Sequence, residues 1–179
     1  NYQLFIVVEP QGPFTAPEKQ AILNYVAAGG GLFMVGDHET SDRDCDGWDS
    51  PHVWNDLSGA TSATATGLFG IWMRVDGFDV QGSEDWFDDG VDSNTETDPA
   101  DPIIRGPLGV GSGGLGLFGS TSMEINPADN STVKAHVWRS GQTHNNSRVT
   151  FATASYGSGR VAAIGDSSPA DDDTGDPSD

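Results

Sequence analysis

The sequence is poor in cysteine, in basic residues and in long apolar runs. Its 179 residues include one cysteine, Cys45, which excludes an internal disulfide framework and a zinc site built from several cysteines. No apolar run approaches the roughly 20 residues that a membrane-spanning helix needs. Eight lysines and arginines stand against 27 aspartates and glutamates, so the formal net charge is −19. We therefore expect no binding to nucleic acid and no docking on an anionic membrane, because both need clustered positive charge.

The acidic excess has three explanations that the sequence leaves open. It agrees with solubility in high salt, since the chain has only two lysines, Lys19 and Lys134. It also agrees with binding of hard cations such as Ca²⁺, and with plain solvation of the surface. A calcium-binding loop favours a secreted or extracellular protein, whereas a halophilic cytoplasm would explain the charge equally well.

Two apolar runs joined by a helical segment predict an α/β fold. Residues 2–8 and 32–35 are rich in β-branched and large apolar side chains and predict strands that are buried on both faces. Between them, Thr15 and Glu18 have the spacing of a capping box at the start of a helix. Such a strand–helix–strand unit joins parallel strands by a right-handed crossover. We expect a single α/β domain over residues 1–179, excerpted from a longer chain.

The remaining pattern adds a second helix, four strands and acidic loops. The expected elements are a helix from Ser50 to about Leu57 and strands at Ile71–Val75, Val133–Trp138, Val149–Ser155 and Arg160–Ile164, the last two forming a C-terminal β-hairpin. Residues 76–101 hold ten carboxylates and little periodicity, which predicts a long acidic surface loop. We expect the sheet to be mostly parallel, with flanking helices.

Polar residues follow two of the predicted strands. Asp37, His38 and Glu39 come after the second strand, and Asp166 and Ser167 come after the last one. Ligands of parallel sheets bind beyond the carboxyl ends of the strands. We therefore predict these five as catalytic residues of a metal-dependent hydrolase. A bound cation would polarise a small-molecule or carbohydrate substrate or activate water, with Asp37 or Glu39 as general base.

A run of alternating aspartates predicts a calcium-binding loop. Asp42, Asp44 and Asp46 precede Gly47, which is the first half of a loop that turns alternate carboxylates toward one cation. The twelfth position is Val53 instead of the bidentate glutamate of an EF-hand, so the shell must be completed elsewhere. The predicted ligands are the following side chains: Asp42, Asp44, Asp46, Asp49 and His52. Histidine and carboxylate together also suit a second divalent metal.

Two other functions fit the same sequence. One is a non-catalytic, calcium-stabilised module of a secreted multidomain protein, in which Trp48, Trp54, Trp72 or Trp86 would stack on carbohydrate. The other is a serine esterase that uses Ser167, in the segment Gly165-Asp166-Ser167-Ser168.

Three segments resemble the class I glutamine amidotransferase-like superfamily, nearest its ThuA-like branch. They are Phe14-Thr15-Ala16-Pro17-Glu18, Val26-Ala27-Ala28-Gly29-Gly30-Gly31-Leu32 and Tyr156-Gly157-Ser158-Gly159-Arg160-Val161. His38 lies about where that branch has its own histidine, but Gly165-Asp166 stands where the branch has Gly-His. The resemblance implies a flavodoxin-like sheet and a link to carbohydrate metabolism. It does not imply glutamine hydrolysis, because the superfamily's nucleophilic cysteine and its His-x-Glu pair are missing.

Overall fold

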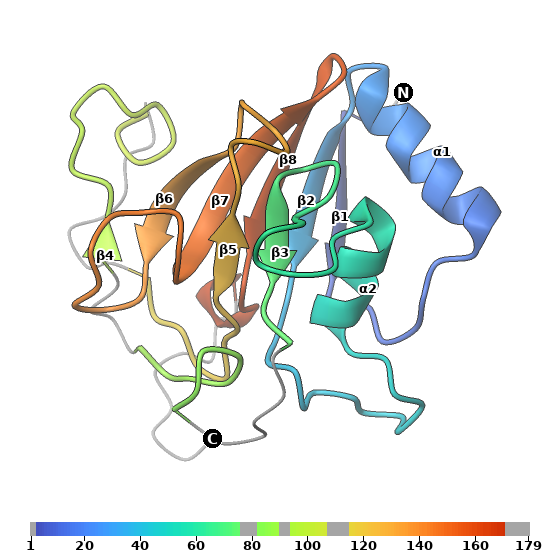
Figure 1. The fold of residues 1–179 in the computed structure, drawn as a ribbon, viewed down its shortest axis with the longest axis horizontal. Helices are drawn as coiled ribbons and strands as arrows, with labels where there is room; N and C mark the ends of the chain where they lie inside the picture. The colour runs from blue at the N-terminus through green and yellow to red at the C-terminus, as the bar shows by residue number, and fades with distance from the viewer. Residues whose placement is uncertain (1–2, 76–81, 90–93, 107–114, 171–179) are drawn as a thin grey trace.

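Residues 3–75, 82–89, 94–106 and 115–170 are described by the computed structural model (Figure 1). Their elements are, in chain order, β1 (Leu4–Val8), α1 (Ala16–Ala27), β2 (Gly31–Val35), α2 (Ser50–Ser58), β3 (Ile71–Met73), β4 (Asn94–Thr95), β5 (Met123–Ile125), β6 (Lys134–Trp138), β7 (Val149–Tyr156), β8 (Gly159–Ile164) and a 3₁₀ turn at Ser168–Ala170. The predicted α/β class is confirmed, since two α-helices and one eight-stranded sheet make up this part of the chain.

The sheet is mixed, which corrects the expectation that it would be mostly parallel. Its order is β1-β2-β8-β7-β5-β3, with β6 beside β7 and β4 beside β6. Only the β1–β2 and β2–β8 pairings are parallel, and the other five are antiparallel. The physical reason lies in the connections, because the C-terminal strands follow one another through tight turns and loops without helical crossovers.

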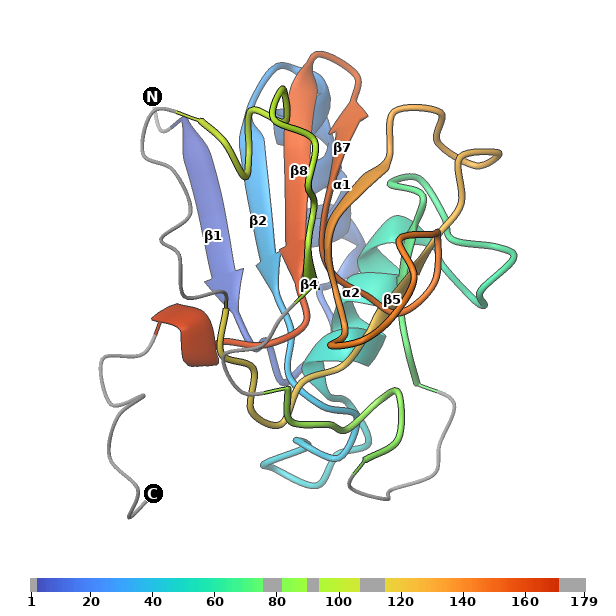
Figure 2. The same cartoon turned by 90° about the vertical axis from the view of Figure 1, so that its left-hand side faces the viewer.

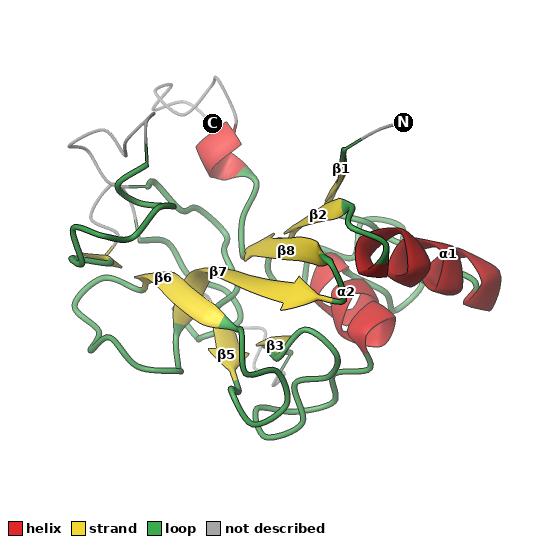
Figure 3. Ribbon diagram, turned by 90° about the horizontal axis from the view of Figure 1, so that it is seen from above, coloured by secondary structure: helices red, strands yellow, loops and turns green. Residues whose placement is uncertain are grey.

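Both α-helices cover the same face of the sheet (Figures 2 and 3). Helix α1 begins with the predicted capping box, in which Glu18 accepts hydrogen bonds from the Thr15 backbone N–H at 2.8 Å and from its hydroxyl at 2.7 Å. Helix α2 is capped at its N-terminus by Asp49, which accepts from the His52 backbone N–H, and at its C-terminus by Gly59, which has a left-handed φ of 72°. The core between helices and sheet is led by these buried side chains: Val26, Leu32, Met34, Trp54, Phe69, Met73 and Ala163.

The prediction that the first strand is buried on both faces was wrong. Leu4, Ile6 and Val8 are 52%, 52% and 56% exposed, and Phe5 is 40% exposed. Among the described residues β1 is the outermost strand of the sheet, so only one side of it has a neighbouring strand from this part of the chain. An apolar run reveals that a strand prefers burial, but it does not reveal whether the surrounding chain supplies the cover.

The described part of residues 76–101 is built into the fold. It contributes β4, an isolated bridge between Phe87 and Ser120, and the buried side chains of Asp85 and Asp101. The remainder of that predicted loop lies outside the described residues.

Candidate functional site

Carboxylates converge at the ends of the three parallel strands. Glu9 follows β1, Asp37 follows β2 and Asp166 follows β8. Val35 lies beside both Val8 and Ile164 in the register, so the three side chains leave the sheet at one edge. This is the edge that the sequence predicted for Asp37 and Asp166.

Arg43 connects the acidic loop to these strand ends. Its guanidinium donates to Glu9 at 2.5 Å and to Asp37 at 3.3 Å. Arg43 was not among the predicted site residues, although a lone arginine among aspartates was a usable signal. It partly offsets the repulsion between two carboxylates on neighbouring strands.

Asp37 and Asp166 are buried, and their carboxylates accept hydrogen bonds from the backbone. Asp37 accepts from the His38 N–H at 2.7 Å, and Asp166 accepts from the Phe118 N–H at 2.6 Å and the Ser168 N–H at 3.0 Å. Burial, together with a smaller contribution from a nearby carboxylate, raises the pKa of each side chain to about 6. The arrangement can hold or release a proton near neutral pH.

His38 and Glu39 follow Asp37 after β2, and they make different contacts with segment 85–86. The His38 ring stacks on Trp86 with centroids 4.8 Å apart, and its Nδ1 lies 2.7 Å from the Thr40 hydroxyl. Burial lowers the pKa of His38, which favours the neutral ring. The Glu39 backbone N–H donates to the carbonyl of Asp85. Segments 37–41 and 85–86 are therefore held together beside the strand ends.

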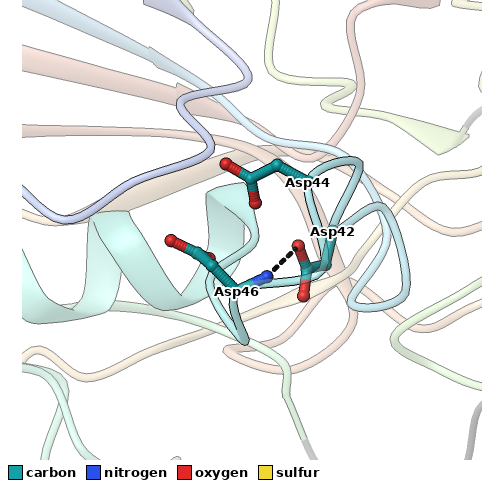
Figure 4. A group of neighbouring side chains, drawn as sticks. All are labelled: Asp42, Asp44 and Asp46. Atoms are coloured by element: carbon teal, nitrogen blue, oxygen red, sulfur yellow. Dashed lines mark hydrogen bonds between the residues drawn. The ribbon is translucent and has the colours of Figure 1, made fainter.

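Three of the five predicted metal ligands form one cluster (Figure 4). Asp42, Asp44 and Asp46 each place a ligand oxygen within 4.8 Å of the others. Asp42 accepts from the backbone N–H groups of Gly47 at 2.8 Å and of Asp46 at 3.2 Å, and Gly47 has a φ of 89°. Desolvation and the neighbouring carboxylates raise the pKa of Asp44. The loop gathers negative charge toward one point.

Asp49 and His52 are not part of that cluster. The His52 Nδ1 lies 2.9 Å from both carboxylate oxygens of Asp49, which also accepts the His52 backbone N–H at 3.0 Å. The hydrogen bond between the His52 ring and the Asp49 carboxylate raises the pKa of His52. The pair begins α2, so its geometry is that of a helix cap.

Ser167 has no histidine partner among the described residues. The neighbouring Ser168 donates its hydroxyl and its backbone N–H to Asp166 instead. Asp166 thus orders the turn that follows β8 and does not orient an imidazole, as an esterase triad would require.

The four tryptophans proposed to stack on sugars divide into two groups. Trp54 and Trp72 are buried, and the Trp54 indole donates to the carbonyl of Val35 at 3.0 Å. Trp48 and Trp86 are half-buried, so only these two offer ring surface to a ligand.

Comparisons with known proteins identify the fold alone. No protein-family model matches the sequence, and no curated protein is detectably similar to it. The mmIFT52 N-terminal domain is 16% identical with a TM-score of 0.53, covering 92% of this chain and 65% of that one. Two cytoplasmic proteins of Salmonella typhimurium, STM1381 from strain LT2 and STM3548, are 15% and 16% identical, with TM-scores of 0.54 and 0.53. This chain is covered to 94% in both alignments, and 62% of each Salmonella protein is covered. The chain thus spans less than two thirds of these neighbours.

These matches correct the resemblance to the glutamine amidotransferase-like superfamily, which was wrong. The solved structures that match are the proteins above, and the flavodoxin-like classification is not confirmed. The resemblance rested on a capped helix, a glycine turn and a hairpin, which are local solutions that unrelated α/β sheets share. None of the described helices is long and apolar enough to cross a membrane.

Proposed function

We propose that this domain is a non-catalytic module that binds Ca²⁺ through Asp42, Asp44 and Asp46. The observation that carries the proposal is the gathering of three carboxylates within 4.8 Å on a loop with a glycine turn. Each carboxylate oxygen has two lone pairs, so the backbone hydrogen bonds to Asp42 leave room for a cation. Ca²⁺ accepts such an open, flexible shell and completes it with carbonyl oxygens and water.

The contacts of Arg43 suggest what the cation would do for the fold. Arg43 lies inside the loop and bridges Glu9 and Asp37 at the strand ends. A cation would therefore order a segment that closes over β1 and β2. The burial of Asp37 and Asp166, and the backbone groups that already bond them, favour this stabilising role over catalysis.

The module would serve a longer, secreted protein, and Trp48 is its best contact for carbohydrate. The lengths of the solved neighbours support a longer protein, since each of them carries additional residues beyond the matched region. Trp48 follows the cluster directly and donates its backbone N–H to Asp46 at 2.9 Å. A halophilic cytoplasm remains the other location that the charge balance favours.

Thermal melts in EDTA and in added Ca²⁺ test the calcium site. Free Ca²⁺ at 10 to 100 times its dissociation constant should stabilise the domain by about 1.4 to 2.7 kcal/mol. Asp44→Asn should remove most of the shift. The matched control is Asp98→Asn, an exposed position where asparagine keeps the hydrogen bond to the Ala100 backbone. An equal shift in both variants, or none in the wild type, would contradict the proposal.

A metal-dependent hydrolase is the second candidate, favoured by one specific observation. Asp37 and Asp166 lie on adjacent strand ends with pKa values raised to about 6, which suits a general acid or base at neutral pH. An ester and glycoside screen with and without Ca²⁺, Mn²⁺ or Zn²⁺ tests it. Activity that disappears in Asp166→Asn would replace the first proposal, and activity that disappears only in Ser167→Ala would favour the esterase.

A further inference from the structure

A threonine, a histidine and an aspartate form a continuous hydrogen-bonded chain beside the sheet. The Thr153 hydroxyl lies 2.7 Å from His136 Nε2, and His136 Nδ1 lies 2.9 Å from the Asp101 carboxylate. Thr153 belongs to β7 and His136 to β6, whereas Asp101 comes from the turn that follows β4. This is the order of contacts by which a carboxylate and an imidazole activate a hydroxyl in nucleophilic sites.

The carboxylate determines which atoms donate and which accept in this chain. Asp101 also accepts from Lys134 Nζ and from two backbone N–H groups. Burial raises the pKa of Asp101, but these donors outweigh burial and hold the pKa well below its usual range, so the carboxylate is ionised and only accepts. His136 Nδ1 therefore carries a proton. Burial lowers the pKa of His136, so the ring is neutral at pH 7 and its Nε2 accepts from the Thr153 hydroxyl.

The hydroxyl lies on the face of the sheet that neither α-helix covers. Ala152 and Ala154 belong to the core between the helices and the sheet, so Thr153 between them points to the opposite face (Figure 2). Asp101 and His136 are only 1% and 2% exposed, whereas Thr153 is half-buried. The acid–base pair is thus shielded from water, while a small reagent can approach the hydroxyl.

Arg160 brings positive charge to the same face. Ala162 of β8 pairs with Thr153, and Arg160 lies two residues earlier on that strand, so it is a diagonal neighbour of Thr153 within reach of a long side chain. Within the described part of the chain, the exposed Arg160 guanidinium makes no ion pair or hydrogen bond. It is therefore free to stabilise a carbonyl oxygen that gains negative charge beside Thr153.

We propose that Thr153 is a covalent modification site that takes an acyl group from an activated ester or thioester. Thr153 Oγ1 bonds to the acyl carbon, its proton passes to His136 Nε2, and the bond from that carbon to the leaving oxygen or sulfur breaks. The leaving group then takes the proton from His136, so the products are an O-acyl threonine and an alcohol or thiol. Asp101 is a positioning residue that keeps the proton of the ring on Nδ1. Because His136 is almost wholly buried, little water reaches Nε2, and the ester should persist.

Acetylation of the whole chain by p-nitrophenyl acetate, located by peptide mass spectrometry, tests the proposal. We expect acetylation at Thr153 to be about 100-fold or more faster than at Ser155, since that is what general-base assistance contributes. Ser155 is the matched control, because it is an exposed hydroxyl at the next position on the same face of β7. Alkaline hydroxylamine should remove the acetyl group from Thr153 but not from Lys19 or Lys134, where it would be held as an amide.

Two variants and a pH series separate an activated hydroxyl from a structural one. The rapid release of one p-nitrophenolate per chain should persist in Thr153→Ser and disappear in Thr153→Val, with circular dichroism showing that both variants are folded. Between pH 5 and pH 8 the rate at Thr153 should rise as His136 loses its proton, below the ordinary value of 6.5, and then stay level. The charged groups that act on His136 in this range are Asp101, Lys134 and Glu96.

Three results would overturn the proposal. One is acetylation that is confined to lysines or is equally fast at Ser155 and Thr153. Another is rapid release that survives in Thr153→Val. The third is a rate at Thr153 that climbs steadily to pH 8, because hydroxide and not His136 would then be the base. None of these outcomes bears on the proposed calcium site, since the step needs no cation.

Discussion

At the scale of single residues, the pH dependence of Asp37 and Asp166 distinguishes them from the other carboxylates. Their pKa values of about 6 lie above the ordinary 3.8, so the folded chain binds more protons than the unfolded chain between these values. Folding stability from this source is therefore present at low pH and is lost as the pH rises from about 4 to 6. Each residue removes up to about 3 kcal/mol at pH 7.

Asp37→Asn should consequently stabilise the domain at pH 7 by about 1 to 3 kcal/mol and have little effect at pH 4. Asparagine can still accept the His38 N–H, and it gives up the ionic contact with Arg43, which is mostly exposed. Urea unfolding between pH 4 and pH 8 measures the effect. A variant less stable than wild type at pH 7 would show that the carboxylate is ionised at low cost in the fold.

The Asp101 side chain is the opposite case, because it is fully buried and amply bonded. It accepts from Lys134 Nζ at 2.7 Å and His136 Nδ1 at 2.9 Å, and from the backbone N–H groups of Ile103 and Ile104. Burial raises its pKa, but these donors outweigh burial and hold the pKa well below its usual range. This network attaches the turn that follows β4 to strand β6. The only sign of it in the sequence was His136, a histidine inside a predicted strand.

Asp101→Ala should destabilise the domain by about 3 to 5 kcal/mol, since it leaves His136 and Lys134 without their buried partner. Thr153→Val, which removes only the hydroxyl 2.7 Å from His136 Nε2, should cost about 1 to 3 kcal/mol. Chemical denaturation of both variants at pH 7 measures the difference. Equal costs would mean that the carboxylate is no more important than the hydroxyl.

At the scale of elements, the positions of the helices and of the β7–β8 hairpin were predicted from the sequence, whereas the burial of the elements was not. The capping box at Thr15, the Pro51 start of α2 and the Gly157 turn all lie where local chemistry predicted them. These signals act within a few residues, so they survive any tertiary arrangement. The exposure of β1 depends on distant segments, and no local pattern reports it. The cap made by Asp49 is local, since it joins Asp49 to His52 three residues later, but the sequence interpretation assigned both side chains to a metal site instead.

The hairpin joining β7 and β8 should tolerate no side chain at Gly159. A Cβ there would lie 2.0 Å from the carbonyl oxygen of Val26 and 2.3 Å from that of Gly30, and both are backbone atoms that cannot move aside. Gly159→Ala should destabilise by about 1 to 3 kcal/mol or more, as overpacking does. Gly12→Ala is the control, because a Cβ at that position meets nothing within 4 Å. Thermal melts of the two variants should differ clearly, and similar melts would contradict this account of the close approach of the hairpin to α1.

At the scale of the whole molecule, the strand directions in the sheet could not all be predicted from the β1–α1–β2 unit. The β1–α1–β2 unit is parallel as predicted, and β8 joins it in the same direction. The strands that complete the sheet are antiparallel because their order is decided by long-range contacts, such as the insertion of β7 between β8 and β5. The strand-end site was found because the parallel part alone determines it. Arg43 was missed because it comes from a loop, and Trp86 was named only as a contact for carbohydrate, without its stacking on His38.

The net charge of −19 also acts at this scale, and it yields the last prediction. Self-repulsion destabilises a compact chain, and salt screens it, so the unfolding midpoint in EDTA should rise between 0.1 M and 2 M NaCl. Replacing Asp42, Asp44 and Asp46 together by asparagine lowers the net charge only from −19 to −16. If repulsion is spread over the molecule, the salt response of this variant should stay close to that of the wild type. A response that largely disappears would place the repulsion in the loop itself, and would make a bound cation the main means by which the fold relieves it.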